Sequence, residues 1–69
     1  MDIVEKEMLS RKSEIKKELR IVFDTNMKIT DWDIPEADDR SAAKLLLEIM
    51  REGLEEISAD IESGKYDNY

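Results

Sequence analysis

The sequence predicts an all-α protein: an antiparallel two-helix hairpin that dimerises into a four-helix bundle. Three observations support this fold class. Apolar residues recur at helical spacing in two long segments, no stretch alternates as a β-strand would, and a connection of about ten residues separates the two segments. A chain of 69 residues is expected to form a single helical hairpin domain over residues 1–69.

The first helix is expected over about residues 3–23. Asp2 and Glu5 have the spacing of an N-cap residue and its N3 partner, which marks the helix start. Arg11 and Lys12 occupy the turn where an apolar residue is due, so they interrupt the apolar stripe of this helix. That stripe is about 100° wide and consists of Met1, Val4, Met8, Ile15, Leu19, Val22 and Phe23.

Residues 24–33 are expected to form the connecting loop. They mix polar turn-forming residues with Met27, Ile29 and Trp32, whose apolar surfaces are costly to leave in water. We therefore expect these three side chains to fold back over the open end of the helix pair. Trp32 is expected to be at least half buried, and the alternative is that it is held out as a candidate contact for a partner.

The second helix is expected over about residues 34–63, followed by a frayed tail over residues 64–69. Asp33, Pro35 and Glu36 resemble a cap and first turn, although a break near Asp38 would shorten the helix. Gly64 is expected to end it. The apolar positions are spaced alternately by four and three residues, as in a coiled-coil seam: Ala43, Leu47, Met50, Leu54, Ile57 and Ile61.

The apolar arc of the second helix is too wide for one partner helix, because Ala42, Leu46, Ile49 and Gly53 extend it on one side. A homodimer would bury both rows, and docking on a larger protein is the alternative. In an antiparallel hairpin whose helix ends are level, Arg11 and Lys12 lie opposite Gly53. Because Gly53 has no side chain, it could make room for the aliphatic part of the Arg11 or Lys12 side chain. The expected oligomer interface is Met8, Ile15, Leu19, Val22, Ala43, Leu46, Leu47, Met50, Gly53, Leu54, Ile57 and Ile61.

The composition indicates that the protein is not an enzyme. It contains no Cys and no His, which excludes thiol and imidazole catalysis and the usual zinc sites. Two helices cannot enclose the dry pocket that acid–base chemistry requires, so no catalytic residue and no cofactor is expected. The acidic cluster departs from a calcium-binding loop and is interpreted as helix capping rather than a metal site: Asp31, Asp33, Glu36, Asp38 and Asp39.

The net charge of −7 disfavours nucleic acid and anionic membranes as direct partners. A basic run on the first helix is broken by two glutamates and is interpreted as a solvated face: Arg11, Lys12, Lys16, Lys17 and Arg20. No apolar stretch is long enough to span a membrane and the start does not resemble a signal peptide, so a cytoplasmic location is expected.

These exclusions favour a non-enzymatic protein–protein interaction module, such as a small acidic regulator, adaptor or assembly factor. Its expected partners are a second copy of the chain and an unidentified protein. The alternative is an acidic inhibitor or antitoxin-like regulator that blocks a nucleic-acid enzyme or toxin by offering carboxylates where phosphates would bind.

Overall fold

The computed structural model describes residues 2–36 and 38–69, and all regular secondary structure in them is helical. Helix α1 spans Ile3–Ser10, α2 spans Lys12–Asp33 and α3 spans Asp39–Glu62. The all-α class is confirmed, with three helices instead of two. Met1 and Ala37, which belong to the expected apolar stripe and second helix, lie outside the described residues.

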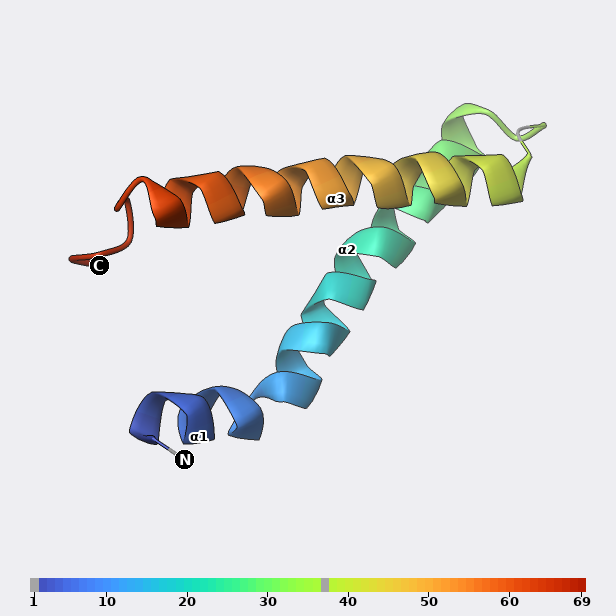
Figure 1. The fold of residues 1–69 in the computed structure, drawn as a ribbon. Coiled ribbons are helices and arrows are strands. Elements are labelled where there is room, and N and C mark those ends of the chain that lie inside the picture. The colour runs from blue at the N-terminus through green and yellow to red at the C-terminus, as the bar shows by residue number, and fades with distance from the viewer. Residues whose placement is uncertain (1, 37) are drawn as a thin grey trace.

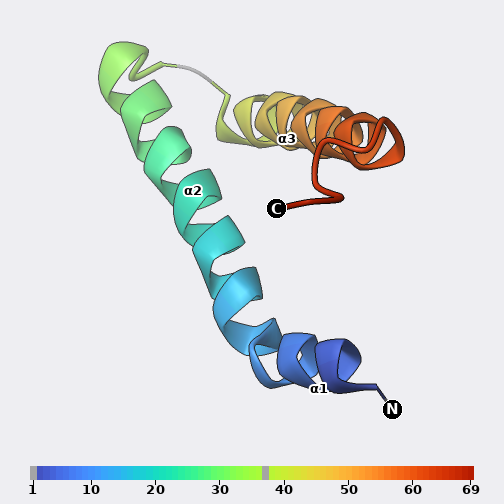
Figure 2. The ribbon, with the colours of Figure 1, turned by 90° about the vertical axis from the view of Figure 1, so that its left-hand side faces the viewer.

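The helices form an open V (Figure 1). Helices α2 and α3 lie close together near the connection from Asp33 to Asp39, and they diverge away from it. The view turned by 90° shows the same divergence, with α1 at the free end of α2 (Figure 2). The close two-helix hairpin is therefore not confirmed.

The first helix is broken at Arg11, so the expectation of one continuous helix over residues 3–23 is wrong. Arg11 leaves helical geometry at φ −101° and ψ 1°, and its amide donates to the carbonyls of Glu7 and Met8 at 3.3 and 3.2 Å. The Ser10 hydroxyl also donates to the Glu7 carbonyl at 2.7 Å. Such local bonds compete with the regular α-helical ladder, which explains a bend where the apolar stripe is interrupted.

Residues 24–33 are helical, so the expectation of a loop there is wrong. The polar residues that resemble turn formers bond within the helix: the Asn26 amide donates to the Val22 carbonyl at 2.8 Å, and the Thr30 hydroxyl donates to the Asn26 carbonyl at 3.0 Å. Helix α2 ends only before Pro35, where Ile34 takes a non-helical conformation at φ −136° and ψ 79°. A residue that precedes proline is driven out of the helical region.

Helix α3 begins at Asp39, five residues later than expected, because Asp38 is its N-cap. The Asp38 carboxylate accepts from the Arg40 amide at 3.2 Å and from the Ser41 hydroxyl at 2.8 Å. This capping satisfies an amide that the first turn leaves without a partner. The break considered near Asp38 is therefore present.

The expected stop at Gly64 is confirmed. Gly64 has φ +89°, its amide donates to the Ile61 carbonyl at 3.1 Å, and the Lys65 amide donates to the Asp60 carbonyl at 3.0 Å. These two bonds form the Schellman motif, which favours glycine at the left-handed position. The tail, expected to fray, continues in turns, with the Asp67 amide donating to the Gly64 carbonyl at 3.1 Å.

The chain has almost no interior. No residue in the described part of the chain is buried, and the half-buried apolar residues lie where α2 meets α3. The accessible surface is 6483 Å², whereas a compact protein of this mass exposes about 4500 Å². A single chain thus exposes about 2000 Å² more than a compact fold would.

Two carboxylates meet where the V closes. A side-chain hydrogen bond with Asp31, together with the negative charge of that residue, raises the pKa of Asp39 above its ordinary value. The folded chain therefore binds this proton more tightly than the unfolded chain does. The stability that the pair contributes is present at acidic pH and is lost as the pH rises through the raised pKa of Asp39.

We expect Asp31→Asn to raise the melting temperature at neutral pH, because it removes the repulsion of Asp39. The substitution should also reduce the loss of stability that occurs as the pH rises above the ordinary pKa range of aspartate. Thermal unfolding followed by circular dichroism between pH 3 and pH 7 measures both effects. Asp33→Asn is the control, since it removes a charge from the same helix end and Asp33 is not among the groups that shift Asp39. An Asp31→Asn pH profile identical to that of the wild type would contradict this account.

Candidate interaction surface

Helix α2 turns one row of side chains toward α3, and the character of the row changes along the helix. Phe23, Met27 and Thr30 are half buried where the helices meet. One and two turns earlier, the same row continues as Lys16 and Arg20, since the spacing along the row is alternately four and three residues. The apolar contact therefore stops where the row becomes cationic, and there the two helices part (Figure 1).

Of the apolar stripe expected on this helix, Phe23 lies in the row that faces α3, whereas Ile15, Leu19 and Val22 lie to one side of that row. Ile15, Leu19 and Val22 lie about 80° around α2 from Phe23 and Met27, at about 100° per residue. Their exposed fractions are 41%, 48% and 51%. Helix α2 thus carries two apolar faces, of which α3 uses one.

The expected interface residues divide into a half-buried group and an exposed group. The half-buried ones lie near the contact with α2 or just beyond it: Ala43, Leu46, Met50 and Gly53. The others are exposed: Met8, Ile15, Leu19, Val22, Leu47, Leu54, Ile57 and Ile61. The single chain therefore buries only part of the expected interface.

Sequence reasoning placed Phe23 in the apolar stripe of the first helix but missed Met27 as its neighbour on the same helical face. Both are half buried, although the residue types around Met27 predict a loop. The available signal was their spacing of four residues, which places two apolar side chains on one helical face. Continuing the helical pattern past residue 23 would have found this contact.

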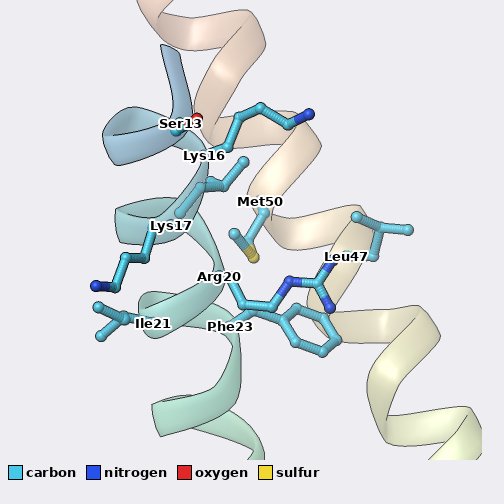
Figure 3. Close-up of a pocket in the computed structure, with 9 residues that line it drawn as sticks. Ser13, Lys16, Lys17, Arg20, Ile21, Phe23, Leu47 and Met50 are labelled. Atoms are coloured by element: carbon cyan, nitrogen blue, oxygen red, sulfur yellow. The ribbon is translucent and has the colours of Figure 1, made fainter. Parts of the chain in front are cut away.

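An open groove of about 670 Å³ lies between α2 and α3. Its apolar lining includes Leu19, Phe23, Leu47 and Met50. Figure 3 shows Arg20 extending from α2 toward α3 beside Phe23, whereas Lys17 and Ile21 point away from α3. The groove therefore combines an apolar floor from both helices with a cationic edge from α2.

Among the residues that the structure describes, no ion pair involves the charged side chains that line the groove. Lys65 and Asp60, 3.5 Å apart at the end of α3, form the one ion pair in the described residues. The expected packing of Arg11 or Lys12 stems against Gly53 is also not formed, since no atom lies within 4 Å of a Cβ placed there. The reason is the divergence of the helices, which moves the start of α2 away from the middle of α3.

The acidic cluster at the closed end of the V has a structural role at Asp38, which caps α3. Within residues 2–36 and 38–69, no three carboxylates are arranged to hold a metal ion. In the same residues, no helix combines the length and the apolar character needed to cross a membrane.

The chain matches no known protein-family model, and no curated protein or solved structure is significantly similar to it. Functional inference therefore depends on its own surface.

Trp32 is 84% exposed, so the expectation that it is at least half buried is wrong. The physical reason is that residues 24–33 are helical. On that helix Trp32 lies about 180° from the row that contacts α3, at about 100° per residue, so it cannot cover the end of the helix pair. Its alternative role as a partner contact stays a prediction.

The native fluorescence of Trp32 should therefore resemble that of an indole in water. We expect little red shift of its emission maximum on unfolding and quenching by iodide or acrylamide in the folded state. A clearly blue-shifted native emission that moves to longer wavelength in urea would contradict this placement, or would show that a partner covers Trp32.

Proposed function

We propose that this protein is a non-enzymatic protein–protein interaction module whose first partner is a second copy of itself. The observation that supports this most strongly is the absence of any buried residue in the described part of the chain, while apolar stripes on α2 and α3 stay exposed. A fold of this size gains stability mainly from apolar burial, and small scaffolds commonly obtain it by oligomerisation.

The exposed area is large enough for such an interface. A stable protein–protein interface buries about 800 Å² on each partner, and obligate homodimers bury more. The chain exposes about 2000 Å² beyond what a compact protein of its mass would expose. A dimer could thus remove most of this excess, and a four-helix arrangement is the simplest way to cover stripes on two helices of each copy.

The module would act as a small regulator, adaptor or assembly factor, with its outer acidic face available to another protein. Several carboxylates of α3 point away from the apolar stripe on the helical wheel, among them Glu48, Glu52 and Glu56. An acidic inhibitor that occupies a phosphate-binding surface is the second candidate, supported by the same carboxylates.

Light scattering coupled to size-exclusion chromatography tests the proposal. At tens of micromolar chain, we expect about twice the chain mass of 8.1 kDa. Leu54→Glu should shift the protein toward the monomer, because it places a charge on the exposed stripe of α3. A folded monomer at these concentrations would contradict the proposal.

Leu45→Glu is the matched control. Leu45 is 62% exposed and Leu54 is 55% exposed, but the two lie about half a turn apart around α3. The same substitution at Leu45 should leave the dimer mass unchanged. Equal effects at both positions would indicate a general loss of stability instead of a defined interface.

A further inference from the structure

We propose that the acidic C-terminal half of α3 from a second copy lies in the groove between α2 and α3, along the edge formed by Lys16 and Arg20. The contact is reciprocal, so each copy inserts its own α3 and receives that of the other. This inference rests on the proposed self-association and specifies which surfaces meet.

Charge complementarity identifies the occupant. Residues 11–20 carry five basic and two acidic side chains, whereas residues 51–62 carry five acidic and one basic. Within one chain these segments lie on the diverging parts of the V (Figures 1 and 2), and no ion pair joins them. A second copy supplies each segment with the opposite charge.

The apolar surfaces correspond in the same way. On the C-terminal half of α3, Leu54 and Ile61 are exposed on one face, with Glu55 and Glu62 along one side of it on the helical wheel. The groove offers the matching pattern, an apolar floor from Leu19 and Phe23 beside a cationic edge. An amphipathic helix recognised in such a groove gains apolar burial from the floor and register from the charges.

A reciprocal contact also closes the assembly. Two copies related by a twofold axis present the same two surfaces to each other, so no groove and no α3 stripe is left over. Closure of the V within one chain would satisfy the same charges and is the competing arrangement. The two arrangements differ in whether the pairing occurs between chains.

Charge exchange between chains separates the two arrangements. One variant carries Lys16→Glu and Arg20→Glu, and the other carries Glu55→Lys and Glu62→Lys. Each variant alone places like charges against each other, and we expect its self-association to weaken by at least about tenfold. An equimolar mixture should restore association as a one-to-one heterodimer, detected by native mass spectrometry and sedimentation.

The matched control carries Lys6→Glu and Lys28→Glu. It changes the net charge as the first variant does, but neither residue lines the groove. Lys6 lies in α1, and Lys28 lies on the helical wheel away from the row of α2 that contacts α3. We expect it to dimerise as the wild type does. Circular dichroism of each variant and of the mixture reports helix content, and restored association in the mixture itself shows that both variants retain the fold.

Three results would overturn the inference. If both variants dimerise as tightly as the wild type, self-association stands but these surfaces are not its contacts. If the mixture does not associate while a chain with all four substitutions regains wild-type stability, the charges pair within one chain. If the wild type is monomeric, the proposed function fails together with this inference.

Discussion

The structure depends on one short apolar contact between α2 and α3. Its half-buried residues include Phe23 and Met27 of α2 and Ala42, Leu46 and Met50 of α3. The contact cannot extend along α2, because the same row continues as Lys16 and Arg20. Beyond it the helices diverge, and the remaining apolar residues of both stay exposed. The open V, the groove and the unpaired charges beside it all follow from this change in one row of side chains.

Local backbone features determine where the helices begin and end. Arg11 breaks the first helix, Pro35 ends α2, Asp38 starts α3 and Gly64 stops it. Each acts within a few residues through capping or backbone conformation. These local features fix the helix lengths independently of any partner. Self-association can therefore bury the apolar side chains of helices whose ends are already defined.

The parts predicted from sequence are those governed by local rules: the all-α class, the Asp2 cap and the end of α3 at Gly64. Residues 24–33 were missed because Asn26 and Thr30 resemble turn formers, whereas in α2 their side chains bond to the helix backbone. That error also misplaced Trp32. The divergence of the helices was harder to predict, since it depends on which of two apolar faces of α2 receives α3.

The central claim is that a single chain lacks enough burial and that a second copy supplies it. The dependence of the melting temperature on protein concentration tests this most directly, because an equilibrium between folded dimer and unfolded monomer shifts with chain concentration. We predict that the melting temperature rises steadily from low to high micromolar chain. A melting temperature independent of concentration over that range, with full helix content at the lowest concentration, would contradict the claim.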